Sequence, residues 1–209
     1  NYSDSLILGN AQSLFTSKLM ANVGIWNRAL SASEIESIYW KGQYADLKGT
    51  ELTNLVSWYN LSANANDSTG TNNGTNNGAT FLTDAYSASS PFLPRIQDKA
   101  TPKGAVALAS GSTSFDGSDD YIDIGDQQIL TTAGTLSCWV KLDSNDSRNI
   151  INKFDSGAGK REYMLYTNAS GHISFTVQDS AGSYDSNTDA LSSTTLNTGI
   201  WYFISATFS

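Results

Sequence analysis

Apolar and polar residues alternate along several short segments of this chain, and this period of two predicts β-strands. In residues 135–142, leucine, cysteine and valine occupy every second position, so these side chains share one face of a strand. In residues 121–124 the two isoleucines likewise share a face. Turn residues such as Gly125 and Gly134 lie between the two segments. We therefore predict two half-buried strands that are neighbours in one antiparallel sheet.

Other segments carry weaker strand signals. Alternating residues on both sides of the turn at 168–171 predict a β-hairpin built from residues 163–166 and 172–177. The sequence TNNG occurs twice in residues 71–78, which predicts a loop. This loop could form tight turns or be disordered, and the sequence leaves both alternatives open. All three prolines fall within residues 87–104, which indicates an extended surface connection. Further predicted strands are residues 6–8, 21–26 and 149–153.

One segment has the signals of a helix. The Ser31 side chain can accept a hydrogen bond from the backbone N–H of Glu34 at the start of a helix. The Glu34 side chain can in turn accept one from the backbone N–H of Ser31, and this reciprocal pattern is a capping box. Apolar residues then recur at helical spacing, and Gly42 can end the helix in a left-handed conformation. We predict one short helix near residues 31–41.

Composition narrows the class of protein. Gly, Ser, Thr and Asn are abundant and only 15% of residues are charged, which is typical of a turn-rich, all-β domain. The net charge of −8 argues against nucleic acid and anionic membranes as partners. Cys138 is the only cysteine, so no intrachain disulfide forms, and its apolar neighbours favour a buried, unreactive thiol. No segment has the roughly 20 apolar residues that a membrane span needs.

Several motifs resemble one known family. Phe115-Asp116-Gly117, Asp120-Tyr121-Ile122 and Leu136-Ser137-Cys138-Trp139-Val140-Lys141 resemble the front half of a laminin-G-like, concanavalin-A-like jelly-roll domain. Trp26-Asn27-Arg28-Ala29-Leu30-Ser31, with Glu34-Ile35, resembles the closing strand and helix of the same family. The resemblance implies an all-β, two-sheet antiparallel jelly-roll sandwich with one short helix.

The order of these motifs is unusual, because the closing motif precedes the opening ones. Residues 1–42 resemble the C-terminal strands and closing helix of one unit, and residues 43–51 are predicted to be a linker. Residues 52–209 resemble the front part of a second, truncated unit, with family-like strands at 55–61 and 198–208. Two arrangements remain open: a piece cut out of frame from a tandem array, or one sandwich that residues 1–42 complete, as in a circular permutation.

The carboxylates do not indicate an enzyme. A retaining glycosidase needs two carboxyl groups about 5 Å apart, and glucanases of this architecture usually place them along one strand. Here the four glutamates are scattered, and Asp119 and Asp120 are adjacent, so that on a strand they would point to opposite faces. His172 and Cys138 lack the neighbours of a nucleophilic site. We predict a non-catalytic protein, with a glucanase-like hydrolase as the least favoured alternative.

Calcium is the cofactor that the loops could hold. A hard cation prefers oxygen ligands from Asp, Asn and backbone carbonyl groups, and many jelly rolls of the resembled family hold calcium at a sheet edge. The alternative is that Asp67 only forms a turn and that Asp116 only bonds the backbone that follows it. The predicted metal ligands are Asp67, Asp116, Asp119 and Asp120.

A glycan would need exposed aromatic rings near hydrogen-bonding side chains. The resemblance implies that Trp139 and Trp201 belong to the core, and we expect the same of Trp26 and Trp58. The candidate ligand-binding residues are therefore aromatics in predicted loops: Tyr44, Tyr86, Phe92 and Tyr184.

The resemblance implies a module of an extracellular, cell-surface or virion-surface protein that binds glycans or proteins. The alternative is a purely structural role, in which the module assembles with neighbouring copies or decorates a phage particle or surface filament. An exposed aromatic cluster would favour the binder, and large apolar self-contacts would favour the structural module.

Overall fold

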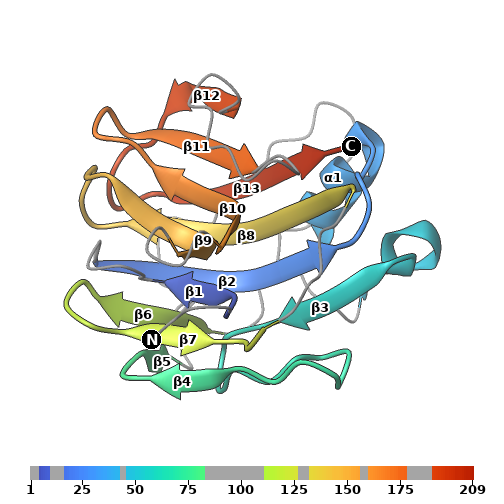
Figure 1. Cartoon of the computed structure of the whole chain (residues 1–209), viewed down its shortest axis with the longest axis horizontal. Coiled ribbons are helices and arrows are strands. Elements are labelled where there is room, and N and C mark those ends of the chain that lie inside the picture. Colours follow the sequence, from blue (N-terminus) through green and yellow to red (C-terminus); the bar gives the residue numbers. More distant parts are fainter. Residues whose placement is uncertain are drawn as a thin grey trace.

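Two antiparallel β-sheets stack face to face in the computed structural model of the chain (Figure 1). The structure describes residues 5–9, 17–42, 46–82, 111–126, 132–155, 160–177 and 190–209. This arrangement confirms the predicted two-sheet sandwich with one α-helix among the described residues.

The seven-stranded sheet contains, in spatial order, β12 (Ala190–Thr195), β11 (His172–Val177), β10 (Lys160–Thr167), β9 (Arg148–Asp155), β1 (Ile7–Gly9), β7 (Tyr121–Asp123) and β4 (Thr75–Asn77). The six-stranded sheet contains β13 (Trp201–Phe208), β8 (Gly134–Leu142), β2 (Ser17–Trp26), β6 (Ser112–Asp116) and β5 (Thr80–Leu82), and β3 (Leu55–Tyr59) pairs with β2. The helix α1 spans Ala32–Lys41, and a short 3-10 turn, η2, spans Gly49–Leu52.

The N-terminal strands lie inside both sheets rather than at their edges. β1 pairs with β9 on one side and with β7 on the other, so that Leu8 lies opposite Ile151 and Ile122. β2 lies between β8 and β6, with Met20 opposite Val140. The described strands before residue 42 and those from residue 55 onward therefore lie in the same two sheets. The division of the chain into units, by permutation or from a tandem array, stays a prediction.

The main core lies between the two sheets. Its side chains come from strands of both sheets, and most of them are completely buried; the contributing strands are β1, β2, β3, β6, β7, β8, β9, β10, β11 and β13. Burying one large aliphatic side chain contributes about 1.5–3 kcal/mol, so this layer dominates the stability of the fold. Cys138 belongs to this core and is free, as predicted, and burial raises the pKa of its thiol to about 12.

The helix forms where its local signals place it. Ser31 and Glu34 form the reciprocal capping box, and Gly42 ends the helix with φ of 67°. Ile38 packs against Trp26 and Trp58 on the outer face of the six-stranded sheet. All three of these side chains are at most 1% exposed, which confirms the core positions predicted for the two tryptophans.

The helix also corrects the prediction that β8 is half buried. Eight of its nine residues are buried, on both faces, and only Lys141 is partly exposed. The reason is that Tyr39 of α1 stacks on Trp139 of β8 with ring centroids 5.3 Å apart. Phe203 of β13 packs beside the same pair. The side of the strand that the pattern assigned to solvent is therefore an aromatic layer under the helix.

Two further predictions are wrong. Residues 121–124 and 135–142 were expected to be neighbours in one sheet, but β7 and β8 lie in different sheets. The alternation identifies the inward face of each strand, whereas pairing with β1 and β2 decides the sheet. The TNNG repeat was expected to be a loop, yet residues 75–77 form β4 along β7. The proline-rich residues 87–104 lie outside the described residues.

Candidate functional site

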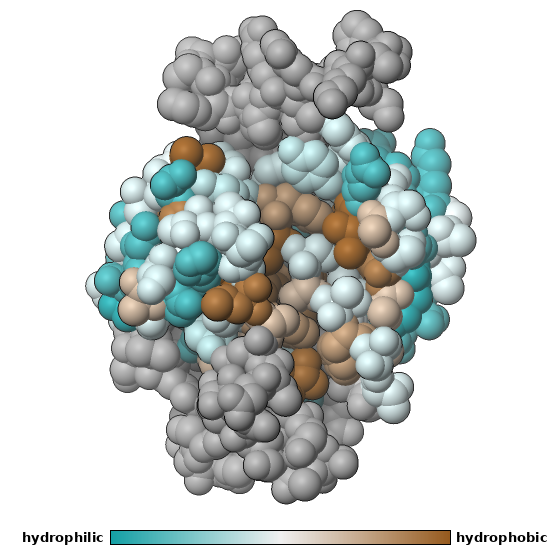
Figure 2. Space-filling model, turned by 90° about the horizontal axis from the view of Figure 1, so that it is seen from above, coloured by the Kyte–Doolittle hydropathy of each residue, from teal (hydrophilic) through white to brown (hydrophobic). Residues whose placement is uncertain are grey.

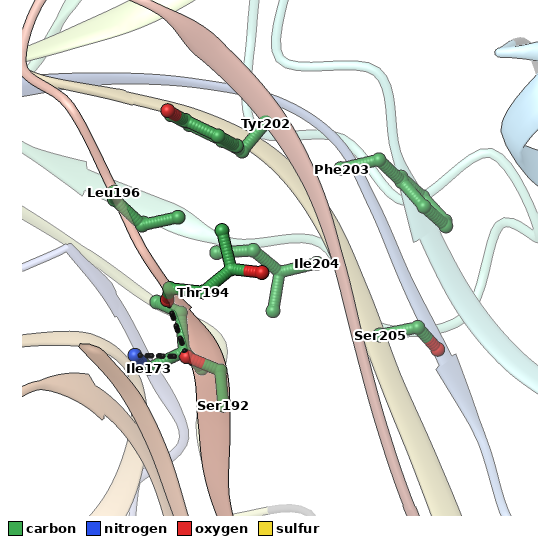
Figure 3. A pocket seen from close by; sticks show the side chains of 8 residues that line it. All are labelled: Ile173, Ser192, Thr194, Leu196, Tyr202, Phe203, Ile204 and Ser205. Atoms are coloured by element: carbon green, nitrogen blue, oxygen red, sulfur yellow. Dashed lines mark hydrogen bonds between the residues drawn. The ribbon is translucent and has the colours of Figure 1, made fainter.

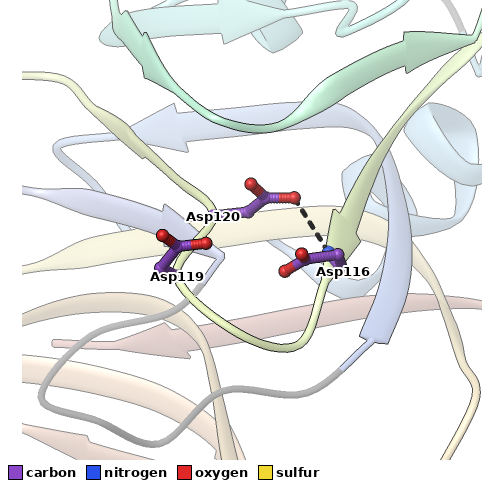
Figure 4. A group of neighbouring side chains, drawn as sticks. All are labelled: Asp116, Asp119 and Asp120. Carbon is purple, nitrogen blue, oxygen red and sulfur yellow. Dashed lines mark hydrogen bonds between the residues drawn. The ribbon is translucent and has the colours of Figure 1, made fainter.

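Three aspartates gather in the turn between β6 and β7. Oxygen atoms of Asp116, Asp119 and Asp120 all lie within 4.8 Å of one another (Figure 4). Asp116 ends β6, and the other two directly precede β7. The structure thus brings together three of the four predicted metal ligands.

Backbone hydrogen bonds give the turn its shape. The Oδ1 atom of Asp116 accepts a bond of 2.7 Å from the backbone N–H of Ser118. The Oδ2 atom of Asp120 accepts one of 2.9 Å from the backbone N–H of Asp116. Asp120 is 7% exposed, while Asp116 and Asp119 are exposed. Within the described part of the chain, each of the three carboxylates keeps at least one oxygen that accepts no hydrogen bond.

A second turn presses against these carboxylates. Gly78, between β4 and β5, has φ of 88°, and a Cβ atom built there would lie 2.1 Å from Oδ1 of Asp120. Any other residue would be strained by this φ and would displace the carboxylate. Gly78 is therefore part of the site. The sequence analysis missed this role, and the only signal was an Asn-Gly pair that tolerates positive φ.

The donor set fits a hard divalent cation. Three carboxylates held close together repel one another, and a cation between them removes that repulsion. Calcium takes six to eight oxygen ligands in flexible geometry, which one acidic turn can begin to supply. Because two of the aspartates are exposed, the remaining positions are open to water or to a ligand oxygen. Asp116, Asp119 and Asp120 are the residues that would hold calcium here.

Asp67 lies apart from this group, and both of its oxygens are in use. Oδ1 accepts bonds of 2.9 Å from the backbone N–H groups of Trp58 and Thr69. Oδ2 accepts bonds from the Thr69 hydroxyl at 2.5 Å and the Asn72 N–H at 3.1 Å. Burial alone would raise the pKa of Asp67, but these hydrogen bonds together hold it below its ordinary value. Asp67 organises the turn after β3, and its part in a metal site stays a prediction.

Three of the four glutamates are engaged in structural contacts. Glu34 forms a salt bridge of 2.7 Å with Arg28, and Glu162 forms one of 2.9 Å with the buried Lys153. Glu51 pairs with Lys41 and accepts a backbone bond in η2. These contacts anchor α1, η2 and β9 and do not place two glutamates face to face.

The four aromatic residues predicted to bind a ligand stay a prediction. Tyr44, Tyr86, Phe92 and Tyr184 all lie outside the described residues. His172, by contrast, is half-buried beside the β10–β11 turn, and its Nδ1 atom lies 2.8 Å from the backbone oxygen of Ser192. That contact gives the histidine a structural role.

Comparison with known proteins identifies a family for part of the chain. Residues 116–209 match the family model described as the concanavalin A-like lectin/glucanases superfamily. The match confirms the resemblance for the motifs from Asp116 onward, and the motif at residues 26–35 lies outside it. No curated protein and no solved structure matches the chain. Because the superfamily contains lectins as well as glucanases, the match supports a module that binds carbohydrate or protein. No described helix is long and apolar enough to cross a membrane.

Proposed function

We propose, starting from the concanavalin A-like match of residues 116–209, that this chain is a non-catalytic module that binds a glycan or protein ligand. A calcium ion held by Asp116, Asp119 and Asp120 would form part of the binding surface. The observation that carries the proposal is the convergence of these three carboxylates in one partly exposed turn. We place the module on an extracellular, cell or virion surface.

The residues of the turn have different parts in this proposal. Asp120 is nearly buried between the backbone N–H of Asp116 and Gly78, so it is the fixed ligand of the group. Asp119 is exposed and accepts no hydrogen bond from the described residues, so it is the ligand that a cation would order most. When bound, calcium would supply a positive centre for hydroxyl or carboxylate oxygens of a ligand.

The proposed extracellular location agrees with the small number of carboxylates available to bind calcium. A turn with three carboxylates and open positions is expected to bind calcium weakly, like extracellular modules with dissociation constants of about 10⁻⁴–10⁻³ M. Such a site would be filled where calcium is abundant, as it is outside cells.

The absence of catalysis is proposed from the contacts of the carboxylates. Three of the four glutamates are held by salt bridges with Arg28, Lys41 and Lys153. A hydrolase would be revealed by release of reducing sugar from β-glucans, and we expect none.

The test is thermal unfolding with calcium or with EDTA, at two protein concentrations. Calcium at a hundred times its dissociation constant adds about 2.7 kcal/mol of stability. For a domain of this size, that corresponds to a rise in Tm of roughly 5–10 °C. The Asp119→Asn variant should lose most of the rise. Asp46→Asn, which removes an exposed charge elsewhere, should keep it.

Two results would contradict the proposal. An equal calcium shift in Asp119→Asn would place the cation elsewhere. A midpoint that depends on protein concentration and not on calcium would support the structural, self-assembling alternative. If the calcium shift is present, a glycan array probed with the calcium-loaded and EDTA-treated protein identifies the ligand class, and only the loaded form should bind.

A further inference from the structure

An apolar groove runs along the side of the sandwich where β12 and β13 lie opposite each other. It consists of two cavities of about 300 and 250 Å³, which share Ile173, Ser192 and Ser205 as lining residues. Figure 2 looks onto this side and shows a hollow with hydrophobic residues along its floor. Figure 3 shows the first cavity, with side chains from β11, β12 and β13 around it.

The floor of the groove is the margin of the main core. Ile173, Phe175, Leu196 and Ile204 are 4–8% exposed and belong to the core cluster between the sheets. None of the residues that line either cavity is charged, although the chain has a net charge of −8. The groove therefore fits uncharged, apolar side chains and excludes ions.

The walls of the groove are fixed. Ser192 Oγ accepts a bond of 3.0 Å from the Ile173 N–H and donates one of 2.8 Å to the Thr194 carbonyl. At one end the Asn197 N–H donates a bond of 3.0 Å to the Tyr202 hydroxyl. Towards the other end, Phe208 and Phe175 approach with centroids 6.2 Å apart. An occupant would enter a site that is already formed.

The two edges beside the groove differ. β12 is short, and its pairing with β11 contains a register shift. β13 pairs with β8 over eight residues in unbroken register, from Trp201 to Phe208. It contains no charged residue and no proline, and in the described part of the chain no strand pairs with its other side. Natural edge strands usually carry charges, prolines or bulges that prevent pairing, and β13 has none of them.

We propose that β13 binds an extended segment of a partner polypeptide as an added strand, whose alternate apolar side chains fill the groove. Backbone hydrogen bonds to β13 would supply affinity, and the groove would select the side chains. The bound segment carries no acidic residue, because the groove offers no cation and the chain is strongly acidic.

A second copy of the chain fits this groove less well than a separate strand. In an edge-to-edge pair, the inward side chains of the other β13, including Ile204 and Tyr202, are already packed against their own core. They cannot also enter the groove of the first copy. The groove would stay unfilled, and the dimer would gain only the backbone bonds.

The proposal can be tested with a synthetic peptide, acetyl-Lys-Val-Thr-Val-Thr-Val-Thr-Lys-amide. Backbone NMR should show that it protects from hydrogen exchange those amides of β13 that point away from β8, and that its binding saturates. The Leu191→Lys variant places a charge on the groove wall at a residue that is already 58% exposed, and we expect at least tenfold weaker binding. Ile200→Lys changes an apolar residue, 41% exposed, that lines neither cavity, and binding should be unchanged.

Peptide controls separate strand addition from nonspecific adsorption. The same peptide methylated at the amide nitrogens of its three valines loses donors on one edge of the strand, and the peptide methylated at its three threonines loses them on the other. One of the two should fail to bind. Equal binding of both, or of a peptide with the order Val-Val-Val-Thr-Thr-Thr, would overturn the proposal. So would protection at β12 instead of β13, or a peptide-free dimer that protects residues 201–208.

Discussion

Two turns in this sandwich contain aspartates in different hydrogen-bonding surroundings. In the turn after β3, both oxygens of Asp67 accept bonds from the backbone or a hydroxyl, so the carboxylate is fully occupied. In the turn between β6 and β7, Asp116 and Asp120 each use one oxygen for a backbone bond, and Asp119 uses neither. The comparison teaches that the surrounding N–H groups, and not the residue type, decide whether an aspartate is structural or available to a cation.

The largest effect is expected when Asp67 is replaced. The Asp67→Ala variant leaves the buried Trp58 and Asn72 N–H groups without their acceptor, at a cost of about 1–3 kcal/mol for each unsatisfied buried group. We expect a total loss of about 3 kcal/mol, measured by urea unfolding, and the same loss with calcium or with EDTA. A loss of stability that appears only with calcium would make Asp67 a metal ligand, and the two turns would then not differ in function.

A smaller loss is expected for Gly78→Ala. The new Cβ atom clashes with Oδ1 of Asp120, and alanine is strained at φ of 88°. We expect a loss of about 2 kcal/mol. Part of this loss should disappear when Asp120 is alanine as well, because the clash is removed. A double-mutant cycle measures this coupling, and strictly additive losses would show that Gly78 and Asp120 do not contact each other.

The pH dependence of stability separates the two turns further. The pKa of Asp67 lies below its ordinary value in the folded protein, so its contribution is complete above the unfolded pKa near 3.8. As pH falls below that value, the contribution is progressively lost. The difference in unfolding free energy between the wild type and Asp67→Asn should therefore narrow from pH 5 to pH 2. A difference that stays constant over this range would show that the charge of Asp67 contributes nothing.

The smallest effect is expected for Asp119→Asn in EDTA. This side chain is exposed and accepts no hydrogen bond from the described residues, so the unfolding free energy should change by no more than about 0.5 kcal/mol. Any change should be a gain, because one of three neighbouring negative charges is removed. Calorimetry with calcium should nevertheless show weakened binding. A large loss in EDTA would mean that Asp119 is as structural as Asp67.

Features that depend on neighbours within a few residues could be predicted from the sequence. The capping box of Ser31 and Glu34 acts over three residues, and the helix begins where it was expected. The three aspartates of the candidate metal site lie within five residues, so the turn itself brings them together. The hairpin formed by β10 and β11 also forms across a four-residue turn, as expected.

Features that depend on distant segments were decided by the tertiary structure. β7 and β8 entered different sheets because their pairing partners, β1 and β2, come from the N-terminal part of the chain. The oxygens of Asp67 accept bonds from N–H groups that only the folded turn presents to them. The groove exists because the edges of two sheets stop opposite each other. Alternation and capping operate between near neighbours, whereas sheet order, hydrogen-bond saturation and cavities arise from contacts between residues far apart in the sequence.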